Sequence, residues 1–217
     1  MTNVTLVILC AGSSTRFGLQ TKKQWLRIED DPLWLFVTKK LLSYYNFDKV
    51  LLTSSKNELN YMKNYSCDIT FIEGGKTRQA SIINALQNVT TDYVMITDVA
   101  RCNVPKGVIL ELLDNKNEAD CIVPVLDVSD TVIYNEETIN RDNVKLIQTP
   151  QLSNTKILKK SLNTKIDYTD ESSAIKANNG KIKYITGSVE SKKLTFSHDL
   201  NEFKSFADIG TGAGYPG

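Results

Sequence analysis

The stretch VTLVILCAGSSTRFG, residues 4–18, joins a strand-sized apolar run to a loop of small residues. In a doubly wound sheet, ligands bind at the carboxyl ends of the strands, where small residues let backbone N–H groups approach phosphates. Residues 9–26 therefore predict an anion-binding loop, with Arg16 and Lys23 as fixed positive charges beside it. The spacing matches neither the GxxxxGK[ST] nor the GxGxxG pattern, so an ordinary strand-to-helix turn is the alternative.

Outward from this stretch, short apolar runs alternate with segments of helical period. The expected strands are Val4–Cys10, Val50–Thr53, Ile69–Ile72, Tyr93–Thr97 and Cys121–Val125. The expected helices are Leu33–Tyr44, Glu58–Asn64, Arg78–Gln87 and Lys106–Asp114. In the third helix, Ala80, Ile83 and Leu86 are predicted to share one face. This alternation predicts an α/β, Rossmann-like fold with a mostly parallel sheet.

The rhythm changes after Val125. Residues 127–150 hold two short extended stretches, Thr131–Tyr134 and Lys145–Thr149, around a polar middle. This pattern predicts a protruding β-arm, too thin to fold alone. Two helices and a strand are expected to follow, at Thr155–Leu162, Glu171–Ala177 and Ile182–Ile185.

We expect one domain over residues 1–200, with its arm at about 127–150. Residues 201–217 form a terminal segment of uncertain origin. Its last part, FADIGTGAGYPG, is similar to the opening strand and glycine loop of a Rossmann-type methyltransferase. Such a fragment has no sheet of its own, so no function is expected from it.

Composition narrows the classes of partner. The chain has 217 residues, 41% hydrophobic residues and a net charge of +1, which gives no indication of a nucleic-acid or membrane partner. Its four cysteines form no CxxC pair, and His198 is the only histidine, so a structural zinc site is not expected. The cysteine usage and the lack of a signal-type N-terminus predict a cytoplasmic protein.

Two further segments carry chemistry. The sequence TDVAR, residues 97–101, follows an expected strand, which places Asp98 where a carboxylate can hold Mg²⁺ against phosphate oxygens. Its alternative role is to cap the next helix. The paired Gly74 and Gly75 permit close backbone approach to a base or ribose, with Ser81 facing the crevice. A two-glycine loop is also a common simple turn.

A last group is scattered along the chain and suits recognition of a polyol phosphate through hydroxyl and guanidinium groups. No spacing rule gathers its members, so the alternative for each of them is an ordinary polar residue on the surface. The group consists of Asp130, Thr131, Arg141, Thr149–Gln151, Thr169, Asp170 and Lys193.

Taken together, the segments resemble the 2-C-methyl-D-erythritol 4-phosphate cytidylyltransferase family of isoprenoid precursor synthesis. The matching pieces are AGSSTRF with KKQ, GGKTR with Ser81, TDVAR, the Asp-Thr pair at 130–131, RDNVKLIQTPQ, TDESSA and KKLT. They occur in family order from residue 4 to about residue 200. The sequence looks most like the N-terminal half of the bifunctional cytidylyltransferase/cyclodiphosphate synthase.

The resemblance implies a nucleotidyltransferase that moves CMP from CTP to methylerythritol phosphate and releases pyrophosphate, with Mg²⁺ or another divalent cation as cofactor. It also implies a homodimer that exchanges its arms. The implied roles are as follows: catalysis by Arg16, Lys23 and Lys193; nucleotide binding by Ala11, Gly12, Ser13, Gly74, Gly75 and Ser81; substrate binding by Arg101, Thr131, Arg141, Thr149 and Thr169; and metal binding by Asp98.

Three positions depart from the family pattern. Ser14 stands where a glycine is usual, Lys22 precedes Lys-Gln in place of a proline, and Cys102 replaces a proline. None of them removes a charge, so we expect altered loop stiffness with the chemistry retained. The alternatives are a ribitol 5-phosphate cytidylyltransferase, which shares most of these motifs, and a catalytically inactive nucleotide-binding protein on the same fold.

Overall fold

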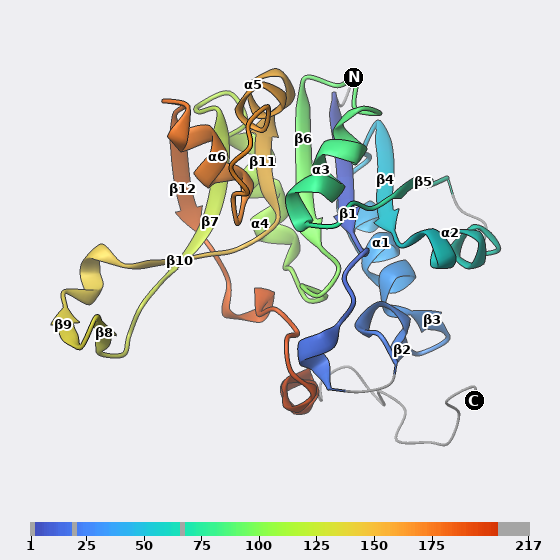
Figure 1. Cartoon of the computed structure of the whole chain (residues 1–217), viewed down its shortest axis with the longest axis horizontal. Helices are drawn as coiled ribbons and strands as arrows, with labels where there is room; N and C mark the ends of the chain where they lie inside the picture. Colours follow the sequence, from blue (N-terminus) through green and yellow to red (C-terminus); the bar gives the residue numbers. More distant parts are fainter. Residues whose placement is uncertain (1–2, 19–20, 66–67, 204–217) are drawn as a thin grey trace.

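The structure is a computed structural model, which describes residues 3–18, 21–65 and 68–203. Its centre is a sheet in the order β10-β7-β11-β6-β1-β4-β5, with β12 paired to β7 (Figure 1). The strands are β1 (Val4–Leu9), β4 (Lys49–Ser54), β5 (Thr70–Glu73), β6 (Tyr93–Asp98), β7 (Cys121–Asp127), β10 (Lys145–Ile147), β11 (Gln151–Asn154) and β12 (Ile182–Thr186).

Most of the pairings in this sheet are parallel. Strand β1 pairs in parallel with β4 and β6, β4 pairs in parallel with β5, and β12 pairs in parallel with β7. The α/β prediction with a mostly parallel sheet is thereby confirmed. Because the parallel strands run the same way, Leu9, Ser54, Glu73 and Asp98 end at one edge, where the loops of a site gather.

One strand in the middle of the sheet was not predicted. Strand β11 runs antiparallel between β6 and β7, and its Leu152 faces Met95 on one side and Ile122 on the other. Strand β10, which comes just before it, also pairs antiparallel with β7. A second small sheet, β2 (Arg27–Ile28) with β3 (Asp31–Pro32), precedes the first long helix.

Helices cover both faces of the sheet (Figure 1). On one face, α1 (Leu33–Tyr44) and α4 (Lys106–Asp114) share a hydrophobic cluster with the strands. On the other face lie α3 (Arg78–Leu86), α5 (Thr155–Ser161) and α6 (Glu171–Ala177). Helix α2 (Lys56–Lys63) packs beside β5. The result is a three-layer arrangement in which the central strands are buried on both sides.

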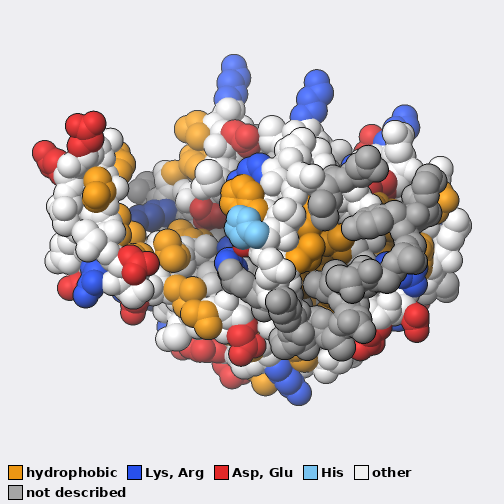
Figure 2. Space-filling view, turned by 90° about the horizontal axis from the view of Figure 1, so that it is seen from below, with side chains coloured by type: hydrophobic (Ala, Val, Ile, Leu, Met, Phe, Trp, Pro, Cys, Tyr) orange, Lys and Arg blue, Asp and Glu red, His pale blue; other side chains and the backbone are white. Residues whose placement is uncertain are grey.

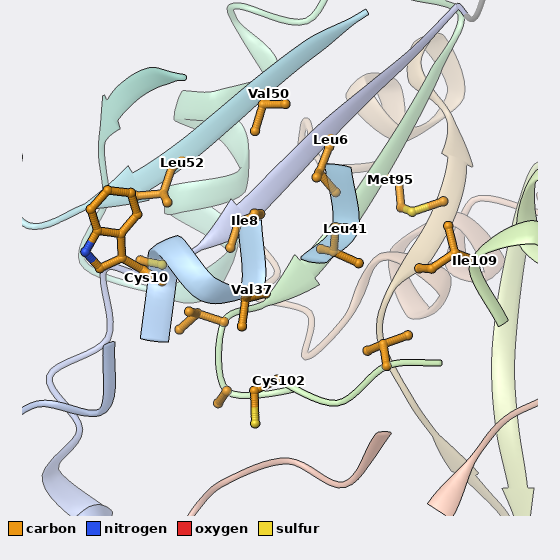
Figure 3. Close-up of a cluster of buried hydrophobic side chains, with 14 of the residues drawn as sticks. Leu6, Ile8, Cys10, Val37, Leu41, Val50, Leu52, Met95, Cys102 and Ile109 are labelled. Carbon is orange, nitrogen blue, oxygen red and sulfur yellow. The ribbon is translucent and has the colours of Figure 1, made fainter. Parts of the chain in front are cut away.

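The alternation of side chains along β1 explains the two layers. Leu6 and Ile8 point into the cluster that contains Val37 and Leu41 of α1, as Figure 3 shows. Val7, the residue between them, belongs to the cluster on the opposite face. Successive strand residues face opposite ways, so a strand that is buried on both faces reads as an unbroken apolar run.

The predicted face of α3 needs a correction. Ile82 and Ala85 are fully buried together with Leu86, whereas Ala80 and Ile83 are only half-buried. The helix begins at Arg78 with Thr77 as its N-cap, and the Thr77 side chain accepts from the N–H of Ala80. The buried stripe is therefore centred on Ile82, Ala85 and Leu86, with Ile83 packed at its edge.

The segment between β7 and β11 contains a hairpin of β8 (Val132–Tyr134) and β9 (Glu137–Ile139). In Figure 1 this hairpin lies apart from the main sheet, and in Figure 2 it forms a separate lobe at the left. Apolar side chains are exposed along the segment, with Ile133 at 68%, Tyr134 at 65% and Leu146 at 53%. Figure 2 shows hydrophobic and acidic side chains together on it.

Along the part of the chain that the structure describes, no helix is long and apolar enough to cross a bilayer. The expected terminal segment lies almost wholly outside the described residues, which end at 203.

Candidate active site

A pocket of about 450 Å³ lies at the carboxyl ends of β1 and β6. Its walls are formed by the loop after β1, the start of α3, the end of β6 and Lys193, which lies in the C-terminal segment that follows β12. The predicted site residues that line it are Ala11, Gly12, Ser13, Arg16, Lys23, Gly75, Ser81, Asp98 and Lys193. Segments that are far apart in the sequence therefore meet in one pocket, as the hypothesis of a shared phosphate site requires.

The loop after β1 turns at Ser14, whose φ of 59° lies in the left-handed region that favours glycine. Its side chain makes contacts that a glycine lacks. Ser14 Oγ accepts from the backbone N–H of Lys23 at 3.1 Å and lies 3.4 Å from Gln24 Oε1. Ser14 thus connects the loop after β1 to the 3₁₀ turn Lys23–Trp25.

Lys23 projects from this turn into the pocket. Its Nζ donates to the carbonyl oxygen of Leu194 at 2.9 Å. Burial lowers the pKa of Lys23, and the nearby charges of Lys193 and Arg16 lower it further. The pocket therefore concentrates positive charge, which an entering polyphosphate would neutralise.

Strand β6 ends in Asp98, whose carboxylate contacts two cations. Arg78 Nε lies 3.1 Å from Asp98 Oδ1, and Lys193 Nζ lies 2.6 Å from Asp98 Oδ2. Burial by itself would raise the pKa of Asp98, but Arg78 and Lys193 together lower it to about 2. Asp98 is therefore ionised at neutral pH, although its side chain is only 13% exposed.

Arg78 and Glu171 lie within the matching segments GGKTR and TDESSA, but no role was predicted for either of them. Arg78 Nη1 lies 2.9 Å from Glu171 Oε1, and the Glu171 side chain has no exposed surface. Burial tends to lower the pKa of Arg78, but Glu171 and Asp98 outweigh that effect and raise it. Arg78 thus links the end of β6 to the start of α6. The two ion-paired residues are 93 positions apart, so no local pattern reveals the pair.

The paired glycines after β5 allow two loops to approach closely. A Cβ atom on Gly74 would lie 2.3 Å from the Cβ of Ala11, and one on Gly75 would lie 2.4 Å from the Cβ of Ala80. Ser81 Oγ accepts from the N–H of Gly75 and donates to the Thr77 carbonyl, both at 3.0 Å. Ser81 therefore shapes this loop from inside, while Gly74 packs behind Ala11 instead of lining the pocket.

The five residues expected to bind the second substrate do not line this pocket. Arg101 Nη1 donates to the Ser191 carbonyl at 2.6 Å, which ties the strand end to the C-terminal segment. Thr149 Oγ1 lies 3.4 Å from the N–H of Asp98 and accepts from it. Thr169 is exposed near the start of α6, and its carbonyl lies 3.5 Å from Arg78 Nη1.

The other two of the five lie on the segment between β7 and β11. Thr131 and Arg141 are exposed there, and the guanidinium of Arg141 donates to the Ser129 carbonyl. Within one chain, neither residue contributes to the pocket walls.

Asp98 is the residue to test for a metal. Among the described residues, no group of three or more His, Cys, Asp or Glu side chains is arranged to hold an ion. Mg²⁺ does not require such a group, because one or two carboxylates plus substrate phosphates commonly hold it. An ionised carboxylate on the pocket wall fits this mode of binding. A cation there would share the Asp98 carboxylate with Arg78 and Lys193, or displace one of them.

Comparison with known proteins extends this picture. Residues 4–206 match the family IspD, 2-C-methyl-D-erythritol 4-phosphate cytidylyltransferase. The bifunctional enzyme IspD/IspF of Aliarcobacter butzleri is 64% identical over 202 residues, which cover 93% of this chain and 54% of that enzyme. This chain therefore spans about half the length of that relative.

Solved structures agree in fold. The bifunctional IspDF of Campylobacter jejuni superposes with a TM-score of 0.88 at 46% identity, over 92% of this chain and 53% of that one. The 2-C-methyl-D-erythritol 4-phosphate cytidylyltransferase of Thermus thermophilus superposes with a TM-score of 0.79 over 94% and 98% of the two chains. At 24% identity, the second likeness supports the fold alone.

Proposed function

The chain belongs to the 2-C-methyl-D-erythritol 4-phosphate cytidylyltransferase family, and we propose that it transfers CMP from CTP to that sugar-alcohol phosphate and releases pyrophosphate. The observation that carries the proposal is the shared pocket of Arg16, Lys23, Asp98 and Lys193 at the carboxyl ends of β1 and β6. The family match over residues 4–206 supplies the substrate class.

In this reaction an oxygen of the substrate phosphate attacks the α-phosphorus of CTP in line. A bond forms from that oxygen to phosphorus, and the bond to the bridging oxygen of the β-phosphate breaks. Negative charge builds on the equatorial oxygens and on the departing pyrophosphate. We assign Arg16 and Lys23, which line the pocket, to stabilise that charge, and we assign Lys193 to exchange its contact with Asp98 for one with the α-phosphate. Catalysis then rests on positioning and electrostatics, with no covalent intermediate on the enzyme.

We assign the metal position to Asp98. Bound there, Mg²⁺ would neutralise phosphate charge and orient the triphosphate. The low pKa of Asp98, about 2, supports this role because the ligand is already deprotonated. The nucleoside end is assigned to the loops around the exposed Gly12 and the half-buried Gly75, which line the pocket and allow the backbone to lie against the base and ribose.

The second substrate is assigned to Thr131, Arg141, Thr149 and Thr169, together with Arg101. Because Thr131 and Arg141 lie on the segment between β7 and β11, we propose that a second copy of the chain supplies them in an arm-exchanged homodimer. The exposed Ile133 and Tyr134 support this assignment, since they give that segment an apolar surface to bury. We place the reaction in the cytoplasm, in keeping with the buried free thiols of Cys10, Cys102 and Cys121.

A paired-substrate assay tests the proposal. Purified protein with CTP and Mg²⁺ is expected to release pyrophosphate with methylerythritol phosphate and to release much less with ribitol 5-phosphate. Faster release with ribitol 5-phosphate would transfer the activity to the other polyol phosphate. Release with neither substrate would favour a nucleotide-binding protein without catalysis.

A further inference from the structure

Glu58 lies on the first turn of α2, behind the turn that carries Lys23, and does not line the pocket. Its carboxylate receives an unusual number of donors from that turn. Trp25 Nε1 donates to Glu58 Oε1 at 2.5 Å, and Gln24 Nε2 lies 3.3 Å from the same oxygen. Lys22 Nζ lies 3.2 Å from Oε2, which also accepts from the hydroxyl of Ser55. One carboxylate thus holds the side chains of residues 22, 24 and 25.

Lys23 is the member of this run that points the other way. Its ammonium group enters the pocket and donates to the Leu194 carbonyl, and its backbone N–H donates to Ser14 Oγ. Gln24 Nε2, besides its contact with Glu58, lies 3.3 Å from the Gly12 carbonyl oxygen. Gln24 therefore connects Glu58 to the loop after β1, and the backbone of Lys23 contacts the same loop through Ser14.

The surroundings of the Glu58 carboxylate favour its ionised form although the side chain is largely buried. Its side chain is only 12% exposed. Burial would raise the pKa of Glu58, but hydrogen bonds from Ser55, Trp25 and Lys22 lower it. Hydrogen bonds to an ionised acceptor are about twice as strong as neutral ones, so this cluster can fix side chains that a neutral residue would leave loose.

Aromatic packing holds the same corner from outside. The Trp25 ring makes edge contacts with Trp34 at 6.5 Å and with Tyr61 at 6.2 Å between centroids. Tyr61 lies on α2, as Glu58 does, so the helix contacts the turn through both the Glu58 carboxylate and the Tyr61 ring. The turn is therefore anchored to α2, whereas the pocket lies on its other side.

We propose that Glu58 is a positioning residue for nucleotidyl transfer, whose carboxylate fixes the turn of residues 22–25 so that the Lys23 ammonium is in place before the nucleotide arrives. This inference rests on the proposed function, which assigns Lys23 to stabilise the negative charge that builds on the reacting phosphates. It predicts that Glu58 acts through Lys23 and that its effect disappears when the lysine is removed.

A double-mutant cycle tests the coupling. Glu58→Gln is expected to lower kcat/KM for CTP by roughly 10- to 100-fold, because small misplacement of a catalytic group costs that much. In a Lys23→Met background, the same change should cost less than about twofold, since residues that act together are not additive. Equal losses in both backgrounds would overturn the proposal, as would an unchanged rate for Glu58→Gln with Lys23 present. Glu118→Gln, which also removes one partner of a lysine pair, at the surface, is the matched control and should leave the rate unchanged.

A second readout needs no catalysis, so it separates failure of this inference from failure of the proposed function. Trp25 and Trp34 are the only tryptophans in the sequence, so a Trp34→Phe variant reports Trp25 alone. In that background, Glu58→Gln should shift Trp25 emission to longer wavelength and increase its quenching by iodide, while Glu118→Gln should do neither. Unchanged emission and quenching in Glu58→Gln would overturn the proposal even if the enzyme is active. The expected shift would support the anchoring even if wild-type protein released no pyrophosphate.

Discussion

Lys193 Nζ lies 2.6 Å from Asp98 Oδ2, although the two residues are 95 positions apart. The contact brings the C-terminal segment to the carboxyl end of β6, the strand that carries the proposed metal ligand. The backbone of Leu194 supports it, because its N–H donates to the Ala100 carbonyl at 2.8 Å and its own carbonyl accepts from Lys23. The C-terminal segment therefore completes a pocket that the central strands begin.

Removal of the Lys193 ammonium group should lower the rate of catalysis strongly. We expect Lys193→Met to lower kcat by at least about 10²-fold, the usual effect of losing one charge contact made in the transition state. Initial rates of pyrophosphate release at saturating substrates measure the loss. Lys183→Met is the matched control, because Lys183 pairs with Glu118 at the surface. Similar rates for the two variants would contradict the role of Lys193.

The alkaline limb of the pH profile should report Lys23. Catalysis needs its charged form, which is present below the pKa and lost as pH rises through it. Because burial and neighbouring cations lower that pKa, the limb of kcat/KM should fall below the ordinary lysine value of 10.5. Lys23→Arg should move the limb upward, since arginine stays protonated. An alkaline limb at the same pH in wild type and Lys23→Arg would assign that limb to another group. Lys23→Ala removes the charge at every pH and should lose at least about 10²-fold in rate.

The Arg78–Glu171 pair should matter for stability. Arg78→Met leaves a fully buried carboxylate without its partner and is expected to cost about 3–5 kcal/mol in the free energy of unfolding. The double variant Arg78→Met/Glu171→Gln should recover at least about 1 kcal/mol of that loss, because no charge remains stranded. Urea denaturation of the three proteins provides the comparison. An equally unstable double variant would contradict the account of this pair.

Arm exchange predicts complementation between two defective chains. Lys23→Ala should impair the phosphate pocket, and Arg141→Ala should mainly raise the KM for the sugar phosphate. In a mixed dimer with exchanged arms, one of the two sites combines an intact pocket with an intact arm. At a sugar-phosphate concentration well below the raised KM, the co-refolded variants should therefore reach roughly a quarter of wild-type activity, because half of the dimers are mixed and each has one good site. Activity no higher than the mean of the separate variants would contradict exchange.

Sequence periodicity predicted most of the fold. Helix α1 matches its predicted range, Leu33–Tyr44, because its apolar residues follow a clear helical period and face the sheet. Strand β11 escaped notice because Gln151–Asn154 contains one apolar residue, and its burial comes from strands on both sides. The segment is a strand because β6 and β7 pair with it on both sides, and its own sequence gives little indication of one.

The site was predictable where its residues cluster in motifs. Asp98 ends β6 and Arg16 lies in a 3₁₀ turn after β1, and the carboxyl ends of these two neighbouring parallel strands meet. Lys193 was first grouped with scattered polar residues, and only the family resemblance implied its catalytic role. The Arg78–Glu171 link was not foreseen, because long-range pairs leave no local spacing. At Ser14, where altered loop stiffness is a prediction from sequence, the backbone is left-handed and the side chain contacts Lys23 and Gln24.

The proposed function requires that the pocket directs chemistry to the innermost phosphorus of a nucleotide. Transfer of label from CTP, with methylerythritol phosphate and Mg²⁺ present, shows which phosphorus reacts. Label on the α-phosphate should appear in a new product that contains both cytidine and the sugar alcohol, while label on the γ-phosphate should leave as pyrophosphate. Label from the γ-phosphate in the sugar product, or α-label released only as free CMP, would contradict the account.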